Sequence, residues 1–355
     1  MRDQMVIGNR RGKVQTVLGL VSPEDLGMTI THEHLLIDFT SVLIVPEGAS
    51  GIGKMHEKIN LENLGWVRYN WASNIDNLQL LDEERSTFEA AQFYNSGGGT
   101  IVDVTSIGLG RDPKALARIS RATRLNVVMG AGHYVEHAQA DDFAALSEQE
   151  IADSIVKDIG IGADSTGVRS GIIGEVGCSW PWSDAEKRSV HGAVIAQRET
   201  GAPLLIHPGR QGRAPLEIIN AIDEWGGDLD HTVMGHIERT IYDAGQLREL
   251  AASGVYMNYD LFGHVCSYYP FAPDTYMPTD HQRIDQIEDL LALGYGDRIL
   301  LAHDVCSKHR LRSFGGHGWD HIPTRVVPRM LDRGISKKQI NRLLVDNPAR
   351  MLTFS

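Results

Sequence analysis

The chain alternates short apolar runs with longer amphipathic stretches, and this alternation constrains its fold more than any other feature. The apolar runs cover residues 28–31, 100–104, 126–130, 171–173, 203–206, 232–235, 255–258 and 299–302. Helical patterns occupy residues 78–96, 113–123, 147–159, 184–200, 214–225, 242–252 and 281–293. Short apolar strands that are separated by helices belong in a parallel sheet covered on its faces. Eight such strands predict an α/β fold, namely a (β/α)8 TIM barrel.

We interpret residues 1–355 as one barrel domain with two additions. A hairpin is expected at about residues 13–20, before the first barrel strand. The segment at about 38–75 is too long for an ordinary connection, which favours an excursion at the rim that forms a lid or an interface. A doubly wound sheet is the alternative fold, but no GxGxxG motif follows the first strand as dinucleotide binding would require.

Charge and cysteine content argue against several classes of function. The 355 residues carry a formal net charge of -12, which opposes binding to nucleic acid or to an anionic membrane. No apolar run approaches the roughly 18 residues of a membrane span, and the start lacks the apolar core of a signal peptide. Cys178, Cys266 and Cys306 are widely spaced and imply neither a disulfide framework nor a cysteine zinc site. We therefore expect a cytoplasmic protein that binds a small-molecule substrate.

Polar side chains follow the predicted strands at the edge where a barrel places its active site. His32 and His34 point to the same face of an extended chain, although such a pair alone is more often a polar strand edge. Later strands are followed by Glu175, His207, His236, Asp260 and Asp304. These groups converge on one rim, where two divalent cations would satisfy them. Imidazole with carboxylate suits zinc, and manganese, iron or cobalt as alternatives.

Motifs around these strand ends occur in a characteristic order from about residue 14 to residue 349. They include Thr31-His32-Glu33-His34, Gly171-Ile172-Ile173-Gly174-Glu175-Val176-Gly177, His207-Pro208-Gly209-Arg210, Tyr259-Asp260-Leu261-Phe262-Gly263 and His303-Asp304-Val305-Cys306-Ser307. In these motifs the chain resembles the phosphotriesterase family of the amidohydrolase superfamily. Within that family it is similar to the phosphotriesterase-related subgroup, some members of which carry a resiniferatoxin-binding label.

The resemblance implies a binuclear metal site with assigned ligands. The buried metal would be held by His32, His34 and Asp304. The more exposed metal would be held by His207 and His236. Better-known members bridge the two ions with a carboxylated lysine directly after Gly-Ile-Ile, whereas here that position is Gly174 and Glu175 follows. Because both groups are monoanions with two oxygens, Glu175 is expected to bridge the ions.

This metal site predicts hydrolysis by a metal-bridging hydroxide. Two divalent ions roughly 3.5–4 Å apart lower the pKa of a bridging water toward neutrality. The hydroxide would attack a carbonyl or phosphoryl centre, and Asp304 would accept its proton and pass it to the leaving group. The alternative for Asp304 is a helix N-cap for the segment that follows.

Four residues are candidate substrate contacts. Arg210 and Arg239 each follow a metal ligand by three residues, so their guanidinium groups would favour an anionic substrate. A structural ion pair, for Arg239 with Glu238 or Asp260, is the alternative. Tyr134 matches the tyrosine that lactonase relatives direct at the metals, although His133 is the alternative at that place. Asp260 matches an acid behind the metal ligands of the family.

The last barrel loop, residues 308–319, is basic, aromatic and rich in glycine, which suits a lid over an anionic ligand. Surface charge is the plainer interpretation of this loop. The remaining histidines are interpreted as surface or packed residues: His56, His137, His191, His264, His281 and His321.

The leading hypothesis is a zinc-dependent hydrolase of an ester, lactone or amide that carries an anionic group. One alternative is a phosphotriesterase or lactonase with promiscuous organophosphate activity. The rim arginines argue against a neutral triester as the natural substrate. A second alternative is a non-catalytic small-ligand-binding protein, but all six predicted ligand positions are intact. Relatives are often dimers, so a homodimer is expected.

Overall fold

The computed structural model describes residues 10–355, so the first nine residues of the expected domain lie outside the described part. Its main sheet contains eight strands in the order β12-β11-β10-β9-β8-β7-β6-β3, and neighbouring strands are parallel. These strands are β3 (Met28–Glu33), β6 (Gly98–Asp103), β7 (Asn126–Ala131), β8 (Ile172–Gly177), β9 (Leu204–His207), β10 (Thr232–Met234), β11 (Tyr256–Tyr259) and β12 (Ile299–Leu301). Each of the eight predicted runs forms one of them.

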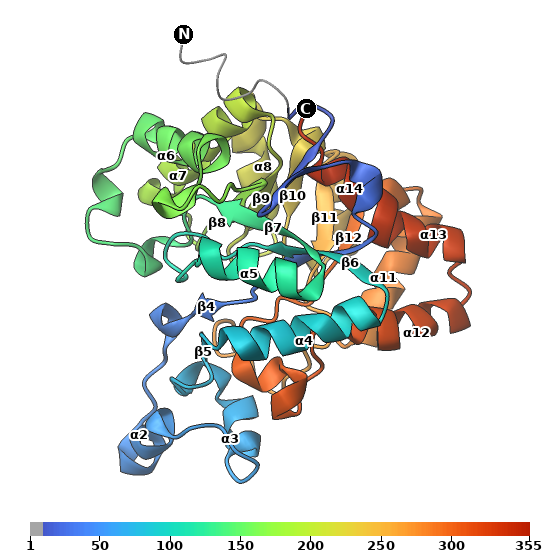
Figure 1. Ribbon diagram of the computed structural model, residues 1–355. Coiled ribbons are helices and arrows are strands. Elements are labelled where there is room, and N and C mark those ends of the chain that lie inside the picture. Colours follow the sequence, from blue (N-terminus) through green and yellow to red (C-terminus); the bar gives the residue numbers. More distant parts are fainter. Residues whose placement is uncertain (1–9) are drawn as a thin grey trace.

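The first and last strands meet and close the sheet. The backbone N–H of Asp304 donates to the carbonyl oxygen of His32 across 3.0 Å. The Thr31 hydroxyl donates to the carbonyl of Leu301 across 3.3 Å. The predicted (β/α)8 TIM barrel is confirmed, and the helices surround the strands (Figure 1).

The helices between strands lie where the amphipathic patterns predict them, with ends that differ by a few residues. They are α4 (Glu83–Asn95), α5 (Pro113–Thr123), α6 (Glu148–Gly160), α7 (Asp184–Thr200), α8 (Ala214–Glu224), α10 (Ala244–Ala252) and α11 (Asp280–Ala292). The short helix α9 (Ile237–Thr240), directly after His236, was not predicted. Three short helices end the chain, namely α12 (Val327–Asp332), α13 (Lys337–Asn341) and α14 (Asn347–Leu352). Across residues 10–355, no helix has both the length and the apolar composition that crossing a bilayer requires.

The prediction of a helix over residues 78–96 was wrong at its start. Helix α4 begins at Glu83 because the Asp82 side chain caps it and accepts a hydrogen bond from the Arg85 N–H across 3.0 Å. The preceding residues form β5 (Gln79–Leu80), which pairs antiparallel with β4 (Ile37–Asp38). This small ribbon holds the two ends of the excursion together.

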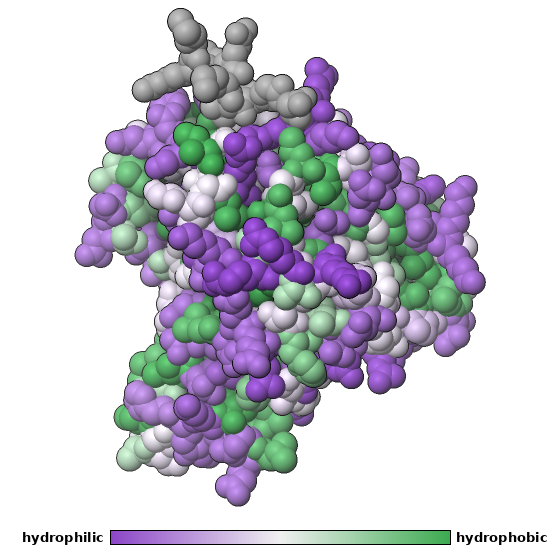
Figure 2. Space-filling view, in the orientation of Figure 1, coloured by the Kyte–Doolittle hydropathy of each residue, from purple (hydrophilic) through white to green (hydrophobic). Residues whose placement is uncertain are grey.

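The excursion carries helices that the sequence pattern did not reveal, α2 (Gly48–His56) and α3 (Leu64–Tyr69). They form a lobe that projects from the barrel in Figure 1. Hydrophobic side chains lie on the surface of this lobe (Figure 2), and Val45 and Leu61 are 63% and 91% exposed. Trp71, near the C-terminal end of the excursion where the chain returns to the barrel, is buried. The excursion is thus attached to the barrel at its base.

The expected N-terminal hairpin is present as β1 (Val14–Thr16) and β2 (Gly19–Val21). The backbone N–H of Phe354 donates to the carbonyl of Lys13 across 3.0 Å, so the hairpin lies beside the C-terminal end of the chain. The two ends of the described chain are close together in Figure 1, on the side of the barrel opposite the excursion.

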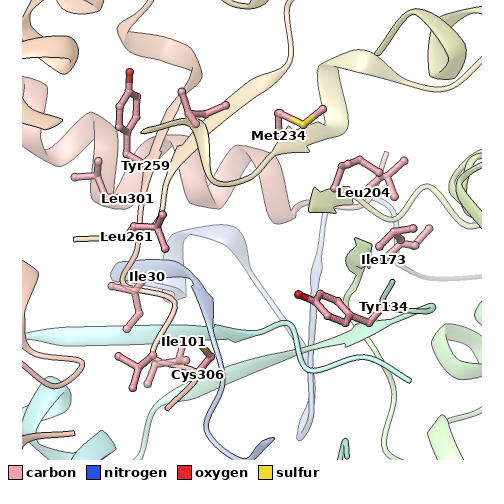
Figure 3. Packing of buried hydrophobic residues seen from close by; sticks show 14 of the residues in the cluster. Ile30, Ile101, Tyr134, Ile173, Leu204, Met234, Tyr259, Leu261, Leu301 and Cys306 are labelled. Atoms are coloured by element: carbon pink, nitrogen blue, oxygen red, sulfur yellow. The ribbon is translucent and has the colours of Figure 1, made fainter. Parts of the chain in front are cut away.

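Alternating strand residues divide the apolar core into two layers. Ile101, Ile173 and Leu301 belong to the cluster that includes the helices, and Figure 3 shows how such residues from successive strands pack. Their sequence neighbours Val102, Ile172 and Leu300 fill the barrel interior. Successive side chains of a strand point to opposite faces, which explains this division. The interior layer also contains residues of the hairpin and of α14, so the floor of the barrel is packed and the opposite rim is left for polar groups.

Candidate metal centre

His32 lies in β3 and His34 directly follows that strand, so both histidines of the His-x-His motif lie at the rim, where both are buried. The His32 Nε2 atom lies 3.4 Å from Glu175 Oε2. The His34 Nε2 atom lies 3.4 Å from Glu175 Oε1 and 3.2 Å from Asp304 Oδ1. The other nitrogen of His34, Nδ1, lies 2.9 Å from the Thr105 hydroxyl. The motif therefore points one nitrogen of each ring at the same two carboxylates.

Glu175 lies in β8 and is the centre of the cluster, since it also faces two histidines from the next strands. His207 ends β9, and its Nδ1 lies 2.7 Å from Glu175 Oε2. His236 follows β10, and its Nε2 lies 3.6 Å from the same oxygen. The charges of His207 and His32 hold the pKa of Glu175 well below its ordinary value despite burial, which alone would raise it. Glu175 is thus an anion between two pairs of histidines.

Two of the predicted ligands have left-handed backbone conformations. The φ angle is 54° at His236 and 49° at Asp304. A non-glycine residue in this region costs about 1–3 kcal/mol and persists only where the surroundings impose it. Asp304 follows β12, and its side chain is 14% exposed and lines the cavity. The N-cap alternative for Asp304 does not hold, because the next helical turn begins after Ser307.

The spacing of the donor atoms fits divalent cations. Ligand atoms about 2.0–2.1 Å from a tetrahedral ion are roughly 3.3–3.5 Å apart. The six predicted ligands form two groups whose ligand atoms lie within 4.8 Å of one another, namely His32 with His34 and Asp304, and Glu175 with His207 and His236. The buried His32 Nε2 has no hydrogen-bond partner in the described chain. His207 Nδ1 and His236 Nε2 are 2.8 Å apart, and both nitrogens lie beside Glu175 Oε2. The donor set fits metal ions.

Asp260 lies behind the histidines and not in the cavity. Its Oδ2 is 2.9 Å from His32 Nδ1, and its Oδ1 is 2.8 Å from His236 Nδ1. It also accepts a hydrogen bond from the His236 backbone N–H, and its side chain is fully buried. The charges of His236 and His32 lower the pKa of Asp260 although burial opposes this. This position orients two ring nitrogens toward the carboxylates, as acids behind metal ligands do.

Glu33, the residue between the two histidines, points away from the cluster and joins the strand ends. Its Oε1 accepts from the backbone N–H of His303 across 2.8 Å, and Oε2 accepts from Val305 N–H across 3.1 Å. Burial raises the pKa of Glu33 to about 8. These bonds fix the backbone on both sides of Asp304. The buried carboxyl group of Glu33, on the first strand, thus positions the last predicted ligand.

The cluster forms the floor of a narrow cavity of about 30 Å³. Tyr134, Arg210 and Arg239, which the sequence predicts as substrate contacts, all line it. The Tyr134 hydroxyl lies 3.5 Å from His207 Nε2, whereas His133 is absent from the lining and packs against Phe143. Tyr134 is therefore the residue of this pair that faces the site.

Neither predicted arginine has a carboxylate partner in the described chain. Arg239 is 3% exposed and donates to the carbonyl of Pro208 and the hydroxyl of Thr240, both across 3.2 Å. Arg210 donates to the Tyr269 hydroxyl across 2.7 Å. The ion pair considered for Arg239 is not formed, because Glu238 pairs with Arg283 instead and Asp260 with the histidines. Two guanidinium groups without carboxylate partners therefore face the cavity, where an anionic ligand group could pair with them.

Several lining residues are not identified by the sequence reasoning. These are Phe39, Trp71, His264, Tyr269, Met277, Cys306 and Arg310, together with Leu261. They lie on the excursion and on loops after β11 and β12, whose paths no hydrophobic period reveals. His264 is packed, as expected, but faces the cavity. The only sequence signal for Arg310 is the basic loop over residues 308–319.

Comparison with known proteins assigns the chain to a family. A model described as the phosphotriesterase family matches residues 12–352.

The chain belongs to the phosphotriesterase family.

Among its relatives, an N-acetyltaurine hydrolase from Danio rerio is 43% identical over 345 residues, which are 97% of this chain and 99% of that protein. A phosphotriesterase-related protein from Nematostella vectensis is 44% identical over 97% of this chain and 99% of its own length. The crystal structure of a resiniferatoxin-binding protein from Rhodobacter sphaeroides superposes with a TM-score of 0.94 at 34% identity, over 98% of this chain and 97% of that one. The chain is a hydrolase of the phosphotriesterase family.

Proposed function

We propose that this phosphotriesterase-family hydrolase cleaves the amide bond of an N-acylated amine that carries a sulfonate or carboxylate. Relatives named N-acetyltaurine hydrolase, at 43–44% identity, support an amide whose amine part ends in a sulfonate. The observation that carries the proposal is the pair Arg210 and Arg239 beside the metal cluster, neither with a carboxylate partner among residues 10–355. Such guanidinium groups bind an anionic substrate group.

Two divalent cations, with zinc as the first choice and manganese, cobalt or iron as alternatives, fit the donor set. One would lie among His32, His34 and Asp304, and the other between His207 and His236, with Glu175 shared. When bound, these ions would supply a water nucleophile active at neutral pH and polarise the substrate carbonyl.

The chain's own residues would position the substrate and move one proton. Arg210 and Arg239 would bind the anion and thereby set the distance between it and the scissile carbonyl. Asp304 would accept the proton of the attacking water and deliver it to the amine nitrogen, because it is the partly exposed carboxylate of the cluster. Tyr134 would donate a hydrogen bond from the cavity wall, since burial keeps its pKa well above the ordinary value and its hydroxyl protonated.

The test is metal content and turnover on one preparation. Elemental analysis should give near two metals per chain, and Glu175→Ala should lose most of them. A panel of N-acetyltaurine, N-acetylglycine, an aryl ester, a lactone and a phosphotriester should show turnover of the anionic amides. Metal binding without any turnover would favour a ligand-binding protein, and a preference for the lactone would favour the lactonase alternative.

The two arginines provide the second half of the test. Arg210→Ala and Arg239→Ala should each raise KM for N-acetyltaurine by about tenfold or more, because a charge-assisted hydrogen bond contributes roughly 1.5–3 kcal/mol. The matched control is Arg213→Ala, an exposed arginine beside Arg210 in sequence. An equal effect of the site variants on a neutral ester would contradict anion recognition.

The remaining expectations are also proposals. The three cysteines are free thiols, which suits the expected cytoplasmic location. We keep the interpretation of one barrel domain, a small-molecule substrate and a homodimer. The mass of the protein particle in solution, compared with the mass of one chain, tests the homodimer.

A further inference from the structure

A third arginine faces the cavity from the last barrel loop. Arg310 is 8% exposed and follows β12 in the turn Lys308–Arg310. Its guanidinium carbon lies 5.3 Å above the Trp71 ring, and its Nη1 contacts the ring of His264. It has no carboxylate partner among residues 10–355. A buried cation of this kind is costly unless a ligand anion approaches it.

Arg310 is separated from Arg210 by an aromatic wall. Arg210 lies 4.8 Å above the Phe271 ring, Phe271 meets Trp71 edge-on with centroids 5.3 Å apart, and Arg310 lies on Trp71. The two guanidinium groups therefore flank an aromatic pair. Of the two, only Arg310 also lines the outer cavity, so it offers a position for an anion that Arg210 does not.

Arg310 also joins the inner cavity to a larger outer one. The outer cavity has a volume of about 360 Å³ and shares Trp71, His264 and Arg310 with the inner cavity. Within residues 10–355, its lining includes Arg68, His309 and His317 and contains no carboxylate. The buried His317 Nε2 lacks a hydrogen-bond partner in the described chain. This lining suits a polar, negatively charged group and opposes a fatty acyl chain.

We propose that the outer cavity is a second anion subsite, centred on Arg310, which accepts an acidic group on the acyl side of the amide. The inference rests on the proposed amide hydrolysis and names its substrate class, amides with an anion at each end. The amine-side anion binds Arg210 and Arg239, the scissile carbonyl lies at the metal cluster, and the acyl-side carboxylate reaches Arg310.

The kinetic test compares three acyl groups on one amine. N-succinyltaurine carries the second anion, its terminal primary amide is a neutral analogue of the same length, and N-acetyltaurine lacks the extension. The wild type should prefer N-succinyltaurine over the neutral analogue by at least about tenfold in kcat/KM. Arg310→Gln should abolish this preference, whereas Arg312→Gln, an exposed arginine of the same loop paired with Asp320, should retain it. No preference in the wild type, or an unchanged preference in Arg310→Gln, overturns the proposal.

A binding measurement separates this proposal from amide hydrolysis itself. Succinate and butanoate contain no scissile bond and differ by one carboxylate, so calorimetry with these two compounds on the metal-loaded protein reports the subsite without turnover. Tighter binding of succinate that is lost in Arg310→Gln supports the subsite even if no amide is cleaved. Equal binding of both compounds, or binding that Arg310→Gln leaves unchanged, overturns it whatever the panel of amides shows.

Discussion

Asp260 illustrates how a residue outside the cavity determines the chemistry inside it. Its two oxygens each face the Nδ1 atom of a different histidine, His32 and His236, which belong to different metal positions in our proposal. A histidine held through one nitrogen presents the other to a metal in a fixed direction. One buried carboxylate therefore aligns a ligand of each ion.

Replacing Asp260 by Asn should weaken metal binding by about 10–100-fold, because a single amide oxygen can accept from only one of the two rings. A competition titration against a chelator measures this affinity. The control is Asp228→Asn, which changes another aspartate 2.9 Å from a histidine Nδ1, that of His231 at the surface. Wild-type affinity in Asp260→Asn would show that the histidines need no such support.

At the scale of elements, a buried ion pair connects three parts of the rim. Arg283 of α11 lies 3.2 Å from Glu238 of α9 and 2.8 Å from Asp280, and it donates to the carbonyl of His264 across 3.0 Å. Glu238 in turn accepts from the Leu261 N–H. The loop after β11, which contributes Leu261 and His264 to the cavity, is thus held by α11, a helix of the layer that surrounds the barrel strands.

Arg283→Met should lower the free energy of unfolding by about 3–5 kcal/mol, because it leaves Glu238 buried without its counter-ion. Urea unfolding followed by circular dichroism measures the loss. Arg298→Met breaks the ion pair with Asp230, which is 73% exposed, and should cost no more than about 1 kcal/mol. Similar losses in the two variants would contradict the assigned difference in burial.

The sequence predicts a strand or a helix correctly where the spacing of its apolar residues marks that element. The eight strands follow from apolar runs, and α5 and α7 have the ends expected from their patterns, since capping residues and glycine or a left-handed residue terminate them. The cluster of candidate metal ligands follows from the strand ends, because a parallel barrel brings them to one rim. The path of the excursion is different. No period indicates that Trp71 returns to the cavity, or that the loop after β12 turns Arg310 toward it.

At the scale of the whole molecule, the cluster concentrates buried charge that metal ions would balance. His32, His34 and Glu175 are at most 4% exposed at their side chains. Ligands that bind only the folded state stabilise it by mass action, which gives about 2.7 kcal/mol at a concentration 100 times the dissociation constant. The fold and the metal site are therefore expected to support each other.

Removing the metals with a chelator should lower the melting temperature, and adding zinc back should restore it. Differential scanning calorimetry with and without chelator measures the shift. Glu175→Ala should melt at nearly the same temperature in both conditions, because it has lost the shared ligand. A wild-type melting temperature that is the same with and without chelator would contradict a stabilising metal centre.

The meeting of the first and last barrel strands has a consequence for biosynthesis. His32 and Asp304 are contributed by opposite ends of the chain, and the hydrogen bond between their backbones is part of the seam that closes the ring. A nascent chain on the ribosome lacks Asp304 until most of it has been translated, so its pair of N-terminal histidines has no complete binding site to fill. A metal held by His32, His34 and Asp304 is thus expected to bind late in the synthesis of the chain, after the last barrel strand has left the ribosome.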